Sequence, residues 1–175
     1  KGTSYLEAAV EKLQQEGHAI EIVRVQGVPN EEVIKLFKSC HLVADQFVSG
    51  FHGYTALEAM AVGRPVLCFL RGPDMMIDPD TCPIIQAGPD EVETRLRECL
   101  GGELDLASIG ASSRRYIEQY YSLEAIAIRL GELYLDTADF PANVQRNLQG
   151  RMTDLEKVQA KRLERFDSLK PAEMH

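Results

Sequence analysis

The stretch GFHGYTALEAMAVGRPV occupies residues 50–66. Its middle part, Tyr54 to Val62, has the composition of a short helix, which Gly63 and Pro65 bring to an end. The residues that follow, Pro65–Leu70, are apolar and predict a strand. A glycine-containing loop, a helix and an apolar strand in this order are typical of one unit of a parallel α/β sheet.

The alternation of strands and helices continues on both sides of this stretch. Strands are predicted at Ile20–Val25, Leu42–Ala44, Pro65–Leu70 and Pro83–Gln86. Helices are predicted from Ser4 to Gly17, Asn30 to Cys40, Tyr54 to Val62, Pro89 to Leu100, and Leu104 to Tyr134 with a break near Tyr121. This order predicts an α/β fold with a Rossmann-like parallel sheet flanked by helices.

Three of the predicted helices begin with residues that favour helix starts. Ser4 and Glu7 have the spacing of a capping box, in which each side chain bonds to a free backbone N–H. Asn30 follows a Gly-Val-Pro turn and is placed as an N-cap. Ser122 is expected to cap a new helix after the break.

The C-terminal part of the chain differs from the rest. We expect residues 1–139 to form one domain and residues 140–175 to form a charged helical extension. An apolar stripe runs through this extension at Leu155, Val158, Leu163 and Phe166. The stripe either packs on the domain by a narrow face or, in the alternative interpretation, supports partner binding or oligomerisation.

Composition limits the classes of function. The chain has 175 residues, 45% of them hydrophobic and 26% charged, and a formal net charge of −8, so we expect no duplex nucleic acid as a partner, because such partners are bound by basic faces. The four cysteines lie far apart, without a CxxC pair. We therefore expect no disulfide framework and no zinc site, and a reduced cytoplasmic setting.

The residues before and within the 54–62 helix suit a phosphate and a sugar. Gly53 lets the backbone approach a ligand closely, and the amides of Gly53, Tyr54 and Thr55 are expected to be free donors at a helix N-terminus. Glu58, one turn further on, can accept paired hydrogen bonds from a ribose diol. By spacing alone, the sequence favours an ordinary exposed helix carboxylate at Glu58 over a ribose-binding one.

The pattern Gly53-x4-Glu58-Ala-Met-Ala-x-Gly63-x-Pro65-Val66 resembles a known signature. It is similar to the nucleotide-sugar-binding C-terminal domain of GT-B-fold retaining glycosyltransferases, in the family 4-like group (glycosyl transferases group 1) and particularly its bacterial members. Lys1-Gly2, Val28-Pro29 and Ala44-Asp45 add support, so the resemblance runs from Lys1 to about Tyr134.

The resemblance implies roles for individual residues. Glu58 would hold the ribose and Lys1 the diphosphate of a UDP-, GDP- or ADP-sugar, and these two are the candidate catalytic residues. The phosphates and the transferred sugar would lie against Gly50, His52, Gly53, Tyr54 and Thr55. Gly27 and Val28 would flank the base. The family implies retention of anomeric configuration and no required metal or other cofactor.

Two features depart from the family pattern. The first glutamate of the Glu-x7-Glu motif would stand at position 50, where this chain has Gly50. The family's first strand and phosphate-binding arginine would precede Lys1, so we expect the natural protein to continue upstream with an acceptor-binding domain, and the fragment alone to be inactive. The resemblance also allows a peripheral membrane contact through that domain.

Two other interpretations stay open. The change at Gly50 is compatible with a catalytically degenerate glycosyltransferase-like module that is kept for interaction. An unrelated flavodoxin-like domain that binds phosphate at the Gly53 loop is the third interpretation.

Overall fold

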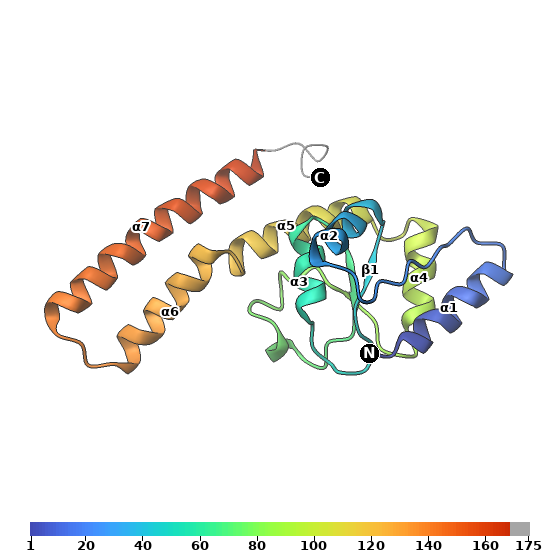
Figure 1. The fold of residues 1–175 in the computed structure, drawn as a ribbon, viewed down its shortest axis with the longest axis horizontal. Coiled ribbons are helices and arrows are strands. Elements are labelled where there is room, and N and C mark those ends of the chain that lie inside the picture. Colours follow the sequence, from blue (N-terminus) through green and yellow to red (C-terminus); the bar gives the residue numbers. More distant parts are fainter. Residues whose placement is uncertain (169–175) are drawn as a thin grey trace.

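The computed structural model describes residues 1–168, so the end of the predicted extension, residues 169–175, lies outside the described part. The chain alternates helices with short strands (Figure 1). The elements are α1 (Thr3–Gln15), α2 (Asn30–Ser39), β1 (Val43–Ala44), α3 (Tyr54–Ala61), β2 (Val66–Cys68), the 3-10 helix η1 (Pro73–Met75), β3 (Ile85–Gln86), α4 (Val92–Gly101), α5 (Leu106–Tyr120), α6 (Leu123–Thr137) and α7 (Ala142–Asp167).

The three strands form a small parallel sheet in the order β1-β2-β3. Val43 is paired with Val66, and Leu67 with Ile85. Because parallel strands need crossover connections, α3 joins β1 to β2 and lies against the sheet. The predicted α/β class and the parallel sheet flanked by helices are therefore confirmed, on a smaller sheet than the sequence led us to expect.

Helices cover both faces of the sheet because side chains of the central strand alternate between them. Leu67 packs on one face with residues of α1 and α4. Val66 and Cys68 pack on the other face, among residues of α2, α3 and α5. In Figure 1, α1 and α4 lie on one side of the strands, and α2, α3 and α5 lie on the other. Strand β2 is thus buried on both faces, as its continuous apolar sequence requires.

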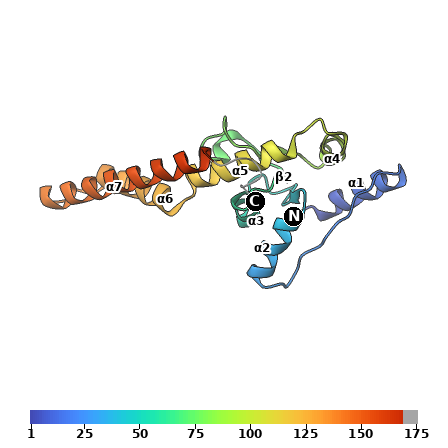
Figure 2. The same cartoon turned by 90° about the horizontal axis from the view of Figure 1, so that it is seen from above.

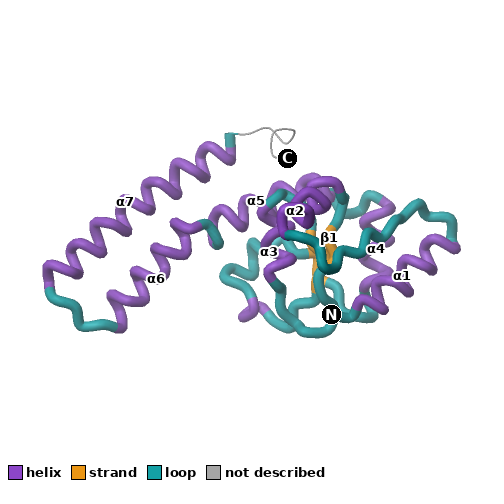
Figure 3. The backbone as a smooth tube through the Cα atoms, in the orientation of Figure 1, coloured by secondary structure: helices purple, strands orange, loops and turns teal. Residues whose placement is uncertain are grey.

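The predicted strand Ile20–Val25 is wrong, because these residues lie in the long loop between α1 and α2 (Figure 3). Ile22 and Val23 are 38% and 57% exposed. A strand is defined by hydrogen bonds to a neighbouring strand, and β1 is paired with β2 alone among the described strands. The apolar, β-branched composition of this segment therefore does not produce a strand here.

Two of the three predicted caps are also wrong. Gly2, with a φ of 82°, stands at the cap of α1, and Ser4 lies inside the helix. Pro29 caps α2, so Asn30 becomes its first residue and its side chain is free to bond elsewhere. The third prediction is confirmed, since the Ser122 hydroxyl accepts a hydrogen bond from Ala125 N–H at 3.2 Å.

Helices α6 and α7 form an antiparallel hairpin that projects from the α/β body, as Figures 1 and 2 show. The two helices cross closely at Gly131, where a Cβ would lie 2.6 Å from the sulfur of Met152. Arg162 of α7 pairs with Glu118 of α5 and Glu124 of α6. These ion pairs hold helix α7 against α5 and α6. Val158, one of the apolar residues predicted to form a stripe on the extension, is nevertheless 49% exposed. Among residues 1–168, no helix has the length and apolar character needed to cross a membrane.

Candidate functional site

Asp45 connects two predicted site residues at the carboxyl edge of the sheet. It directly follows β1, and its side chain is 2% exposed. One carboxylate oxygen, Oδ2, accepts a hydrogen bond from Gly53 N–H at 2.9 Å, and the other, Oδ1, lies 3.5 Å from Lys1 Nζ. Lys1 and Gly53 are far apart in sequence, so this buried carboxylate holds them side by side.

The backbone of Lys1 is also fixed at this edge. Its carbonyl accepts a hydrogen bond from Phe47 N–H at 2.8 Å. Gly2 follows in a left-handed conformation, where a Cβ would meet the side chain of Val48 at 2.8 Å. This close approach explains the glycine after Lys1. The Lys1 side chain is 62% exposed, so its ammonium group can reach a ligand in solution.

The start of α3 offers fewer free donors than the sequence predicted. Gly53 caps the helix in an extended conformation, and its N–H donates to Asp45. The prediction that the Gly53 amide is a free donor is therefore wrong. The N–H groups of Tyr54 and Thr55 have no acceptor among residues 1–168. Tyr54 is 85% exposed, which leaves this end of the helix open to an anion.

Glu58 is linked to the loop that contains Gly27 and Val28. Asn30 Nδ2 donates a hydrogen bond to Glu58 Oε1 at 3.0 Å, and Asn30 begins α2 directly after this loop. Gly27 has a φ of 66° and nothing within 4 Å of its Cβ position, and Val28 is exposed. The carboxylate predicted to bind ribose and the loop predicted to flank the base are thus brought to the same side of α3.

His52 lies against the end of α5. Its Nε2 is 3.3 Å from the hydroxyl of Tyr121, and the two rings meet edge to face. Burial lowers the pKa of His52, and the nearby Asp45 carboxylate opposes this effect only in part. His52 is therefore neutral at pH 7. Its Nδ1 atom is buried and has no hydrogen-bond partner among the described residues.

Gly50 stands where the local backbone requires a glycine. Its φ is 81°, and its carbonyl accepts a hydrogen bond from Arg71 N–H at 2.8 Å. A Cβ at this position would lie 2.9 Å from Arg71 Cβ and 3.1 Å from Arg71 Nε. A glutamate could not occupy position 50 without moving the backbone or Arg71, so the loop is built around the glycine.

Four residues of this region were missing from the predicted site, namely Asn30, Asp45, Arg71 and Tyr121. Asp45 carried a usable signal, because an aspartate directly after a buried strand lies at the edge where ligands bind in parallel sheets. The sequence predicts a capping role for Asn30, but its side-chain partner, Glu58, is 28 residues away. Tyr121 lies 69 residues from His52, and no local sequence pattern connects the two.

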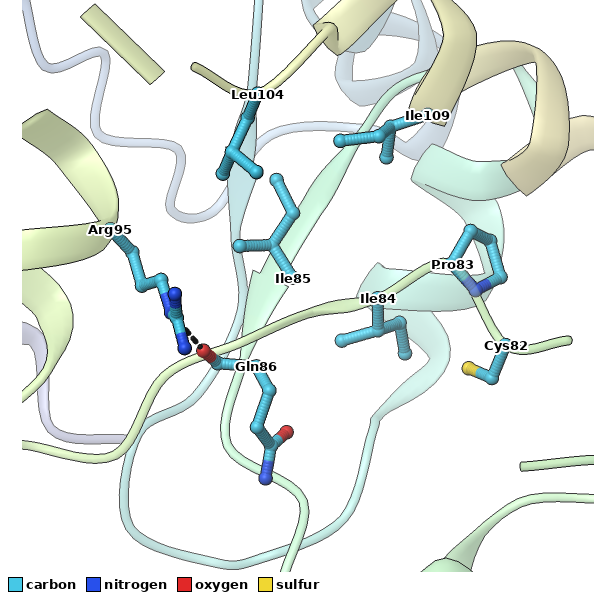
Figure 4. A pocket seen from close by; sticks show the side chains of 8 residues that line it. All are labelled: Cys82, Pro83, Ile84, Ile85, Gln86, Arg95, Leu104 and Ile109. Carbon is cyan, nitrogen blue, oxygen red and sulfur yellow. Dashed lines mark hydrogen bonds between the residues drawn. The ribbon is translucent and has the colours of Figure 1, made fainter. Parts of the chain in front are cut away.

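A separate hollow of about 300 Å³ lies beside β3 (Figure 4). It contains none of the predicted site residues. Its lining is mostly apolar, and Arg95, one of the lining residues, donates a hydrogen bond from Nε to the carbonyl of Gln86 at 3.0 Å. This arginine is therefore engaged by the backbone of the sheet.

The cysteines of the described residues are all free thiols. Burial raises the pKa of the Cys68 thiol to about 11, and Cys68 packs as a core residue. Residues 1–168 contain no group of three or more His, Cys, Asp or Glu side chains placed to hold a metal ion.

No known family model, curated protein or solved structure matches the chain.

Proposed function

We propose that this chain is the nucleotide-sugar-binding half of a GT-B-fold retaining glycosyltransferase. The observation that carries the proposal is the meeting of Lys1, Asp45 and Gly53 at the carboxyl edge of a parallel sheet. Ligands bind at this edge in open α/β sheets, where loops lead into helix N-termini. The family signature and the spatial cluster thus concern the same residues.

The groups at this edge match the parts of a nucleoside diphosphate. The Lys1 ammonium and the free Tyr54 and Thr55 amides supply positive charge and donors for the phosphates. Asp45 is a negative charge at the same place, but Lys1 and the Gly53 amide already compensate it. A bound diphosphate would therefore lie beside an Asp45 carboxylate whose charge is already compensated, not beside an unpaired negative charge.

Glu58 would bind the ribose, and the exposed Gly27–Val28 loop would lie against the base. Glu58 Oε1 accepts from Asn30, which fixes the carboxylate and leaves Oε2 for a ribose hydroxyl. During transfer, Lys1 and the helix amides would stabilise the charge that develops on the leaving diphosphate. An acceptor held by a second domain would complete the reaction, so this chain alone binds nucleotide without turnover.

Calorimetric titration with UDP, GDP and ADP and their 2′,3′-dideoxy analogues tests this assignment. The wild type should prefer the ribose form of its nucleotide, because Glu58 accepts hydrogen bonds from the hydroxyls. Glu58→Gln should lose about tenfold in affinity for the ribose form and almost nothing for the dideoxy form. Glu156→Gln, an exposed carboxylate on α7, is the matched control and should behave as wild type.

Two outcomes would contradict the proposal. One is the absence of saturable binding by any of the three nucleotides. The other is an equal loss for ribose and dideoxy forms in Glu58→Gln, since this would place the ribose elsewhere.

Gly50 and Arg71 favour a second candidate, a glycosyltransferase-like module that no longer transfers sugar. The loop holds an arginine beside the position where the family pattern has a carboxylate. A degenerate module should bind a nucleoside diphosphate and its sugar conjugates equally. A transferase half should instead distinguish among them, because the sugar contacts the site. The same titrations, extended to nucleotide sugars, separate the two candidates.

A further inference from the structure

Helix α6 carries an apolar stripe on the face that points away from the rest of the protein. Its members are spaced by three or four residues, so they line one side of the helix. Leu123, Leu130 and Leu133 are 84%, 48% and 55% exposed. Ile126 and Tyr134 complete the stripe and are also exposed. Isolated exposed leucines are common, but a continuous row of this kind marks an interaction surface.

The opposite face of α6 is already occupied. Ala125, Ile128 and Gly131 are buried there, and Gly131 meets Met152 of α7. Arg162 of α7 is ion-paired with Glu124, which keeps the hairpin closed. Helix α7 therefore cannot turn to cover the stripe, and α6 is apolar on two opposite sides. A helix of this type is normally covered on both.

The charges beside the stripe are complementary to those on a second copy of the same helix. Arg129 and Asp136 lie on the same edge of the stripe, one heptad apart, and neither forms an ion pair within residues 1–168. If two α6 helices pair antiparallel about a twofold axis between Gly131 and Glu132, Leu130 faces the partner's Leu133. In this register Arg129 is level with the partner's Tyr134 and lies two residues, about 3 Å along the helix axis, from the level of the partner's Asp136, which its long side chain can reach; the reciprocal pair forms on the other side of the axis.

We propose that the protein forms a homodimer through antiparallel pairing of α6 with α6. Pairing in this register buries the exposed leucine row of α6. The same register brings Arg129 of each copy close to Asp136 of the other copy. It also suits the overall shape, because the hairpin projects from the body (Figure 2). Antiparallel pairing would send the two α/β bodies to opposite ends. The interface is distinct from the candidate nucleotide site and does not depend on the function proposed for it.

Sedimentation velocity of the full 175-residue chain across the micromolar range provides the first test. We expect a dimer for the wild type and a monomer for Leu130→Glu, which buries a charge at the centre of the stripe. Val158→Glu, at an equally exposed apolar position on α7, is the matched control and should stay dimeric. Circular dichroism shows whether each variant is folded. A wild type that is monomeric at every concentration, or a folded Leu130→Glu that still dimerises, would overturn the proposal.

Charge reversal tests the antiparallel register. Arg129→Glu and Asp136→Arg each replace two attractive pairs by two repulsive ones, so each should weaken dimerisation roughly tenfold. The double variant Arg129→Glu/Asp136→Arg restores attraction and should recover the wild-type dissociation constant. Additive weakening in the double variant would overturn this pairing. Both single variants lie on the solvent-exposed edge of α6, so the fold is expected to tolerate them.

Discussion

At the scale of single residues, Asp45 organises the candidate site. Its buried carboxylate accepts the Gly53 amide and attracts the Lys1 ammonium, so one side chain sets both the start of α3 and the position of the cation. A Cβ on Gly53 would lie 3.3 Å from Asp45 Oδ2, a tight contact. The close approach of Gly53 to the Asp45 carboxylate is therefore enough to explain why this position is a glycine, whether or not a ligand also lies against it.

His52 should make the stability of the protein depend on pH. Burial lowers its pKa in the folded state below the usual value of about 6.5. The folded protein then binds fewer protons than the unfolded chain, so stability is fully present above the unfolded pKa. It is lost as the pH falls through the window between that value and the lower folded pKa.

Urea denaturation at pH 7 and pH 5 measures this contribution. Carboxylates with lowered pKa change stability in the same direction, so the comparison is between wild type and His52→Gln. The wild type should lose more stability over this interval than His52→Gln. His18→Gln, at an exposed histidine in the loop after α1, serves as the control and should match the wild type. An identical loss in wild type and His52→Gln would show that His52 titrates as it does in the unfolded chain.

At the scale of elements, local sequence patterns predicted helices well and strands less well. The helices at α3, α5 and α6 follow from apolar spacing, from the glycine and proline after residue 62, and from the Ser122 cap. Ile20–Val25 has the composition of a strand, but a strand also needs a neighbour with which to pair. The sequence predicts that the Asn30 side chain caps its own helix, but it donates a hydrogen bond to Glu58 of α3. Such outcomes depend on tertiary contacts, which a local pattern does not contain.

Packing of α5 on the turn after α3 should depend on Gly110. A Cβ at this position would fall well inside van der Waals contact with the backbone carbonyl oxygen of Gly63. Gly110→Ala should therefore lower the free energy of unfolding by about 1–3 kcal/mol, because backbone cannot move aside cheaply.

Gly150→Ala is the matched control for this substitution. Gly150 lies inside α7 with nothing within 4 Å of its Cβ position, so alanine there should stabilise the protein by about 0.5–1 kcal/mol through helix propensity. Thermal or urea unfolding of both variants measures the difference. Equal effects of the two substitutions would contradict the close approach of α5 to the Gly63 turn.

At the scale of the whole molecule, the sheet brings together segments that the sequence keeps apart. The motif that resembles a glycosyltransferase signature drew attention to Gly53 and Glu58, and the parallel order of strands predicted the edge where they lie. The sequence did not indicate that Asp45 would occupy the Gly53 amide, or that Arg71 would fill the space beside Gly50. The contact of Gly50 with Arg71 joins the loops that follow β1 and β2, so only the assembled sheet defines it, whereas the Asp45 contact closes the loop between β1 and α3 on itself.

We infer that Lys1, the Gly27–Val28 loop and the start of α3 bind one nucleoside diphosphate. Backbone amide spectra recorded during titration with UDP, GDP or ADP test this claim most directly. We predict saturable shifts that cluster at Gly2, at Gly27 and Val28, and at Tyr54 and Thr55, while residues around the hollow beside β3 stay unchanged. Shifts confined to that hollow, or no saturable shift with any of the three nucleotides, would contradict the account.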